Sequence, residues 1–150
     1  SAIARLCGEL PEAGRVSGAV SAANRCLLAA AWMQAGGVLH GFSVGLSAAA
    51  LVLIGLGHVA WAGVLVLGLL QAYFALRTAF DRQIFVHWAA AWQADPTRQI
   101  GDLEEFDSQL GRSGAAGIEQ RIAGAMRLWR YQAGCLLLQI AAALAAYGMN

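Results

Sequence analysis

The residues best suited to chemistry are two polar side chains in an otherwise apolar stretch. Gln34 and His40 both lie in a segment that contains no Asp, Glu, Lys or Arg. An ionisable residue inside a membrane is a functional candidate, since an imidazole can ligate haem, relay a proton or line a substrate path. The alternative is a neutral imidazole that hydrogen-bonds to a neighbouring helix. Both interpretations are open from the sequence alone.

Small residues recur at every fourth position in the same stretch. They are Gly37, Gly41, Gly45 and Ala49. On a helix this spacing forms one shallow face that lets a second backbone approach closely, which matters in lipid because apolar surface alone does not drive helices together there. The face is predicted to be a helix-packing or oligomer interface, either within one chain or between chains.

A third set of candidates is large and mostly aromatic. The set consists of Phe80, Ile84, Trp88, Trp92 and Phe106. Aromatic residues are favoured anchors at protein interfaces, so these side chains are candidates for docking a partner. Two alternatives are that they close a local core between neighbouring helices, or that some of them face lipid headgroups.

Catalytic and metal-binding motifs are absent from the sequence. There is no Gly-x-Ser-x-Gly elbow, no His-Glu-x-x-His and no glycine-rich phosphate loop with Lys. The three cysteines share no metal-type spacing. A formal net charge of +1 without a clustered basic face gives no case for nucleic-acid binding. The expectation is a protein that is not an enzyme and that binds no cofactor or metal.

The elements that position these residues are set by the absence of charge. No charged residue occurs from Cys26 to Leu76 or from Tyr131 to Asn150. A bilayer-spanning helix needs about 20 mostly apolar residues, so the first run fits two helices and the second fits one. The predicted fold class is an all-α integral membrane protein with three transmembrane helices. A soluble protein with a buried hairpin is the competing interpretation, but core helices of this length without a charge are rare.

The arginines predict how the chain crosses the bilayer. All ten basic residues are arginine, and they lie in segments 1–25 and 77–130. Because basic residues near span ends stay cytoplasmic, these two segments are predicted to be cytoplasmic, and the tail beyond the third span periplasmic. The predicted order is an interfacial segment 1–25, a transmembrane hairpin 26–76, a cytoplasmic helical segment 77–130 and a third span 131–150. Arginine without lysine, with abundant Ala and Gly, suggests a GC-rich bacterium and hence its inner membrane.

Aromatic residues give an independent indication of the span ends. Trp and Tyr prefer the headgroup level of a bilayer. Trp32, Tyr73, Trp129 and Tyr131 fall at the predicted cytoplasmic ends, and Trp61 and Tyr147 fall near the opposite ends. The first span remains too long for a simple crossing, so it is predicted either to tilt strongly or to place its first turns in the interface.

Local signals predict where the other helices begin and end. The second span is expected to continue as a helix to Ala94 and to end at Asp95-Pro96. A short helix is expected from about Thr97, interrupted by the glycine-rich stretch 111–117, and a helical pattern resumes at Ile118. The N-terminal segment carries the apolar set Ile3, Leu6 and Leu10 before Pro11, which is consistent with a short amphipathic helix on the cytoplasmic face of the membrane.

Function follows by elimination. The first hypothesis is a small non-catalytic integral membrane subunit or accessory protein that stabilises, docks or regulates a larger membrane assembly. Its expected partners are membrane lipids and other integral membrane proteins or copies of itself, with no nucleic acid. The alternative is a homo-oligomeric channel or small transporter whose pathway is lined by Gln34, His40 and Ser47. A haem-binding electron carrier is a third hypothesis.

Overall fold

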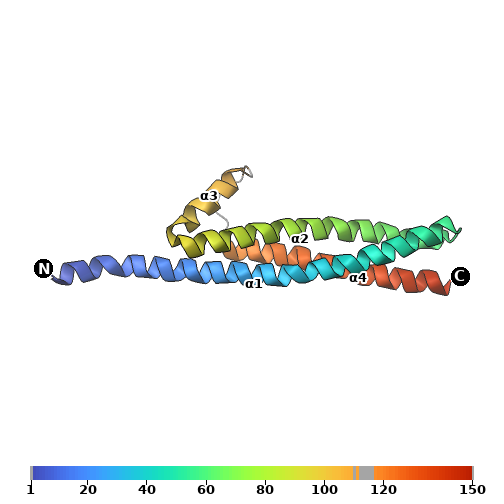
Figure 1. Ribbon diagram of the computed structural model, residues 1–150, viewed down its shortest axis with the longest axis horizontal. Coiled ribbons are helices and arrows are strands. Elements are labelled where there is room, and N and C mark those ends of the chain that lie inside the picture. The colour runs from blue at the N-terminus through green and yellow to red at the C-terminus, as the bar shows by residue number, and fades with distance from the viewer. Residues whose placement is uncertain (1, 110, 112–116, 150) are drawn as a thin grey trace. The chain divides into compact units, whose positions relative to one another are not determined.

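The computed structural model describes residues 2–109, 111 and 117–149, with side chains from residue 18 onward except at residue 19. Four α-helices and two short 3-10 helices make up the described chain (Figure 1). In order they are α1 (Ala2–Gly55), η1 (Val59–Trp61), α2 (Ala62–Ala94), η2 (Pro96–Arg98), α3 (Gln99–Gln109) and α4 (Ile118–Gly148). No strand occurs among these described residues.

The predicted fold class is confirmed. Three helical segments are long and apolar enough to cross a membrane: Val20–Gly55, Val59–Ala94 and Ile118–Gly148. The shorter helix α3 lies between the second and third of them. Each segment has more than 30 residues. A bilayer core about 30 Å thick takes only about 20 residues of helix, so all three helices extend beyond the hydrocarbon.

The N-terminal segment differs from its prediction. A separate short helix does not form there, and α1 instead runs without a break from Ala2 through Pro11 into the first span. A proline removes one hydrogen bond from the ladder of a helix and strains one turn, but it does not by itself force a helix to end.

The turn of the hairpin is built on one glycine. Gly57 has φ +96, a conformation that residues with a side chain rarely adopt. Its N–H donates to the carbonyl of Ile54 at 2.9 Å, and the N–H of His58 donates to the carbonyl of Leu53 at 3.0 Å. These two bonds form a Schellman motif, which satisfies the last carbonyls of α1. The glycine therefore ends α1 and reverses the chain into η1 and α2.

The predicted boundary at Asp95-Pro96 is confirmed. α2 ends at Ala94, and Asp95 is extended at φ −144 and ψ 96, as a residue before proline should be. The Asp95 carboxylate accepts hydrogen bonds from the Thr97 N–H at 3.0 Å and the Thr97 hydroxyl at 2.6 Å. Asp95 thus caps η2, with proline at the first position of the new helix. The structure also confirms the expected restart at Ile118.

The chain divides into two compact units. Unit 1 comprises residues 1–30 and 83–123, and unit 2 comprises residues 31–82 and 124–150. In unit 2, α1 runs parallel to α4 and antiparallel to α2. The paired positions show this, since Gly36 and Ser43 on α1 bond in the same order to Gln132 and Gln139 on α4.

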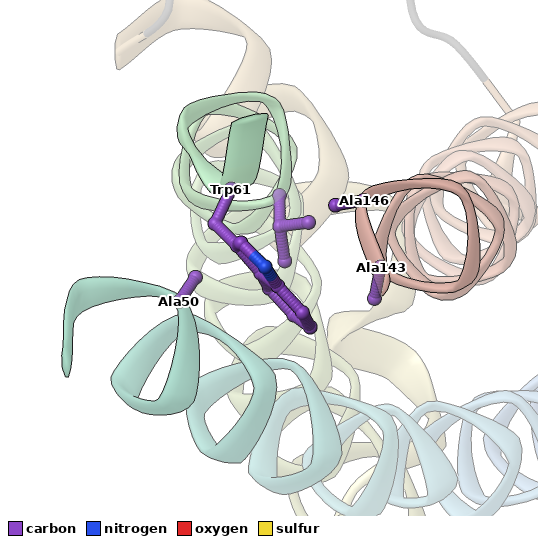
Figure 2. Packing of buried hydrophobic residues seen from close by; sticks show 5 residues of the cluster. Ala50, Trp61, Ala143 and Ala146 are labelled. Atoms are coloured by element: carbon purple, nitrogen blue, oxygen red, sulfur yellow. The ribbon is translucent and has the colours of Figure 1, made fainter. Parts of the chain in front are cut away.

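The buried core of unit 2 near the hairpin turn is small and tightly packed. Figure 2 shows the indole ring of Trp61 lying between Ala50 of α1 and Ala143 and Ala146 of α4. Val64 completes this cluster of buried residues. Trp61 was predicted to sit at the membrane interface as a headgroup anchor, but its ring fills this core because alanine on both neighbouring helices leaves room for it. Tyr147 is exposed, as such an anchor must be.

The aromatic residues at the other end of unit 2 lie close together. The Trp32 and Trp129 rings meet edge to face at 6.2 Å, and the Phe74 ring contacts Tyr131 at 5.7 Å and Tyr73 at 5.5 Å. From the level of Trp32 to the turn, α1 rises about 35 Å, close to the ~30 Å of a hydrocarbon core. This geometry favours a first span that begins near Trp32, with the preceding apolar turns outside the hydrocarbon.

Candidate functional site

The densest polar contact in the spans of unit 2 centres on Gln139 of α4. Its amide nitrogen lies 3.2 Å from the carbonyl of Ser43, 3.0 Å from the hydroxyl of Ser47 and 3.2 Å from the carbonyl of Val64. Its amide oxygen accepts a hydrogen bond of 2.6 Å from the Ser43 hydroxyl. One side chain therefore ties α4 to both α1 and α2. Its polar groups are used in binding helices together, where no water is available to satisfy them.

A second glutamine repeats the contact two turns away. Gln132 of α4 is fully buried, and its amide nitrogen donates to the carbonyl of Gly36 at 2.6 Å. Both α1–α4 pairs join residues that are 96 positions apart in sequence. The bonded residues on α1 are seven positions apart, and so are their partners on α4. This heptad spacing on two parallel helices is typical of a left-handed helix pair.

Two glycines allow the close approach that these bonds require. A Cβ atom at Gly36 would lie 2.9 Å from Gln132 Oε1, and a Cβ atom at Gly68 would lie 2.0 Å from the Ser47 hydroxyl oxygen and 2.8 Å from Gln139 Nε2. Any larger residue at these positions would push the glutamines out of place. Gly36 and Gly68 are therefore the packing glycines of unit 2.

The glycine face predicted from the sequence lies elsewhere on α1. Gly37, Gly41, Gly45 and Ala49 are exposed, and a Cβ atom added to any of the three glycines would meet nothing within 4 Å. Among the described residues, no helix packs against that face. Of the two predicted uses, packing within one chain is not what the structure has, and packing against another chain stays a prediction.

His40 is hydrogen-bonded to another span. Its Nδ1 lies 3.1 Å from the Gln71 side-chain oxygen. This is the helix-to-helix bond that the sequence left open as one alternative. Gln34 is exposed and Gln71 is fully buried, so the intramembrane partner of His40 is Gln71 and not Gln34.

Unit 1 holds a cluster of aromatic rings. Trp88 stacks on Trp92 at 5.5 Å with an interplanar angle of 11°, and it meets Phe85 at 6.0 Å and Phe106 of α3 at 5.3 Å edge to face. The Trp92 indole N–H donates to the Asp102 carboxylate at 3.0 Å. These contacts fasten α3 to α2.

An ion pair is buried beside these rings. Arg121 of α4 contacts the carboxylate of Asp107 at 2.5 Å, and both side chains are almost fully buried. The guanidinium carbon also lies 5.5 Å from the Trp88 ring centroid and 5.0 Å from that of Phe106, within cation–π range. Arg121 thereby joins α4 to both α2 and α3. On the exposed side of the same unit, Arg25 pairs with Glu119.

The prediction that these aromatic residues dock a partner is corrected for the two tryptophans. Trp88 and Trp92 are buried within the chain, so they cannot serve as surface anchors. Phe106 and Ile84 are partly buried, and only Phe80 is well exposed. The local core between α2, α3 and the start of α4, which the sequence offered as an alternative, is what the structure forms. It forms because α3 folds back and places Phe106 on Trp88.

The described part of the chain contains no assembled metal site and no continuous polar pathway. No group of three or more His, Cys, Asp and Glu side chains there is placed to hold a metal ion. Cys26 and Cys135 are both buried free thiols. The three residues of the predicted channel pathway do not form a line, because His40 and Ser47 face other helices whereas Gln34 is exposed.

Comparisons with known proteins add no identification. No protein-family model matches the chain, and neither a curated protein nor a solved structure matches it.

The residues that the sequence patterns did not indicate are Gln71, Gln132 and Gln139, together with Gly36 and Gly68. A usable signal was present, since Gln132 and Gln139 are the only glutamines of the third apolar run and stand at heptad spacing. Amide side chains seven residues apart lie on one face of a helix, and in a span they predict that this face packs against another helix. The buried pair of Arg121 and Asp107 had no comparable signal, because its partners come from different helices.

Proposed function

We propose that this chain is a small non-catalytic subunit or accessory protein of a larger membrane assembly. The observation that carries the proposal is the outward glycine face of α1. The chain packs its own helices through Gly36 and Gly68 and leaves Gly37, Gly41 and Gly45 bare. A bare small-residue face in lipid gives a second protein the close backbone approach on which helix association depends.

The distribution of polar groups in unit 2 supports the same proposal. The buried Ser43 hydroxyl, the Gln139 amide and the Gln132 amide nitrogen are engaged in bonds between the helices of the chain itself. A transport path would need polar groups that face a water-filled cavity or substrate. Internal bonding of this kind suits a rigid structural part.

The proposed location is a bacterial inner membrane with the N-terminus and α3 in the cytoplasm. It is supported by the arginines of segments 1–25 and 77–130 and by the positive-inside rule. Two exposed positions offer a matched test, Ser108→Cys on α3 and Ala60→Cys in η1. In intact spheroplasts a membrane-impermeant maleimide should label the Ala60→Cys variant and not the Ser108→Cys variant. The reverse pattern would invert the proposed orientation.

Native purification tests the proposed function. The tagged full-length chain is extracted from its own membranes in mild detergent, and co-purifying proteins are identified by mass spectrometry. Gly41→Leu should release the partner chains, whereas Gly63→Leu, at an equally open glycine on α2, should retain them. Equal retention by both variants would contradict the role of the α1 face.

The same preparation separates the channel alternative. A ring of identical chains would show a discrete multiple of 15.7 kDa by light scattering and would conduct ions in liposomes. An accessory subunit should instead elute with unrelated chains and should not conduct by itself.

A further inference from the structure

Two exposed arginines of unit 2 lie beside one seam between α2 and α4. The Phe74 and Tyr131 rings, 5.7 Å apart, mark where these helices meet. Arg77 lies one turn after Phe74, and Arg127 lies one turn before Tyr131. α2 and α4 are antiparallel, because Gln139 bonds to Val64 further along the same seam. Both arginines are therefore displaced from the ring contact toward the same end.

The charges at this end of unit 2 are unbalanced. The charged residues of the unit are four arginines and one aspartate, Arg77, Asp81, Arg82, Arg127 and Arg130. Asp81 lies one further turn along α2 and attracts Arg77. Among the described residues, no ion pair within 4.0 Å involves Arg77 or Arg127, and both are exposed. Exposed guanidinium groups without a close carboxylate attract an anion that reaches this end of the unit.

The seam on the other side of the ring contact is apolar. Leu70 lies one turn before Phe74 on the same face of α2, and Leu138 lies two turns after Tyr131 on α4. Both leucines are exposed. Gly134 lies between Tyr131 and Leu138, and a Cβ atom there would meet nothing within 4 Å. The seam thus joins a cationic end to exposed apolar side chains against which an acyl chain can lie.

The geometry points to a binding site for an anionic phospholipid, with the headgroup phosphate between Arg77 and Arg127 and an acyl chain along Leu70 and Leu138. Guanidinium groups bind phosphate with paired, charge-assisted hydrogen bonds. The border between apolar and charged surface is where phosphates of a bilayer lie. The Tyr131 ring, half-exposed at this border, suits the same level. A free phosphate would match only the cationic half of this surface.

Spin-label spectroscopy tests the site on the full chain. The protein is reconstituted in phosphatidylcholine vesicles that contain a trace of spin-labelled phosphatidylglycerol or spin-labelled phosphatidylcholine. The motionally restricted fraction of each label gives the preference for the anionic lipid. Arg77→Gln with Arg127→Gln should lower that preference at least about fivefold, because it removes the guanidinium bonds to the phosphate, and one hydrogen bond to a charged group is worth about a factor of ten.

A matched variant with the same loss of charge provides the control. Arg98→Gln with Arg130→Gln removes two exposed arginines that do not flank the seam, and it should lower the preference less than twofold. Arg77→Lys with Arg127→Lys keeps the charge and should retain most of the preference. Circular dichroism establishes that each variant is folded before its preference is compared.

Three results would overturn the site. They are the absence of a phosphatidylglycerol preference in the unmodified protein, an equal fall in the seam and control variants, and displacement of the labelled lipid by inorganic phosphate at constant ionic strength. The last result would show a site for a free anion and not for a lipid.

Discussion

Gln139 and Ser43 satisfy each other in both directions. The Ser43 hydroxyl donates to Gln139 Oε1 at 2.6 Å, and Gln139 Nε2 donates to the Ser43 carbonyl at 3.2 Å. A reciprocal pair of this kind fixes both the rotation of α1 and its position along α4. In lipid such bonds are retained because the alternative is an unsatisfied polar group in hydrocarbon.

Replacing Gln139 should weaken unit 2 without changing its fold. Gln139→Leu keeps the side-chain volume but removes the bonds to Ser43, Ser47 and Val64, and it should destabilise the protein by about 1–2 kcal/mol. Reversible unfolding in mixed micelles measures the difference. Gln34→Leu is the control, since Gln34 is exposed and should change stability by less than about 0.5 kcal/mol. Equal losses in the two variants would contradict the role given to Gln139.

The glycines of the chain should fall into two classes. Gly68→Ala introduces a methyl group against Ser47 and Gln139, whose amide cannot move aside without losing its bonds, so it should cost about 1–3 kcal/mol. Gly41→Ala meets open space and should leave the free energy of unfolding of the isolated chain unchanged or slightly increased. Thermal unfolding in detergent, at a concentration where the chain is monomeric, compares the two. A larger loss for Gly41→Ala would reverse the assignment of the faces.

Sequence patterns predicted the course of the chain better than the contacts across it. The break at Asp95-Pro96 and the restart at Ile118 were predictable because each depends on a few adjacent residues and on backbone preferences. The absence of charge predicted the spans because it reflects the cost of placing charge in hydrocarbon.

The candidate site was less predictable because it depends on how three helices are rotated against each other. Gly36 and Gly37 are neighbours in sequence, yet only Gly36 touches another helix. The spacing of four residues predicted a packing face at Gly37, Gly41 and Gly45. The close contacts occur instead at Gly36 and Gly68. The same ambiguity affected Trp88, whose buried position depends on the return of α3.

The cap of η2 should show a pH dependence. Hydrogen bonds from Thr97 to the Asp95 carboxylate lower the pKa of Asp95 below its ordinary value. The folded pKa is depressed, so the stabilisation is fully present above the unfolded pKa of about 3.9 and is lost as the pH falls through the folded value. Asp95→Asn also caps a helix and should remove this acid-dependent loss. The measurement is the difference in unfolding temperature between the two proteins from pH 6 to pH 2.5.

A control for the acid titration is Glu104→Gln, on the exposed face of α3. It should leave the acid dependence of stability close to that of the unmodified protein. If Asp95→Asn and the unmodified protein lost stability in parallel at every pH, the hydrogen bonds from Thr97 would not stabilise the carboxylate.

The buried pair of Arg121 and Asp107 should be the most sensitive point of unit 1. Arg121→Met leaves the Asp107 carboxylate buried beside apolar rings and removes the cation over Trp88 and Phe106, so it should cost about 3–5 kcal/mol. Arg121→Met combined with Asp107→Leu removes both charges and should recover much of that loss, because replacing a buried pair by apolar side chains costs little. Arg98→Gln breaks an exposed pair with Asp102 and should cost less than about 1 kcal/mol. Denaturant unfolding followed by the near-ultraviolet signal of the tryptophans gives these values and that of Asp107→Leu alone, which completes the double-mutant cycle. If the double variant were as unstable as the sum of its single changes, Arg121 and Asp107 would contribute independently and the junction of α2, α3 and α4 would not depend on their pairing.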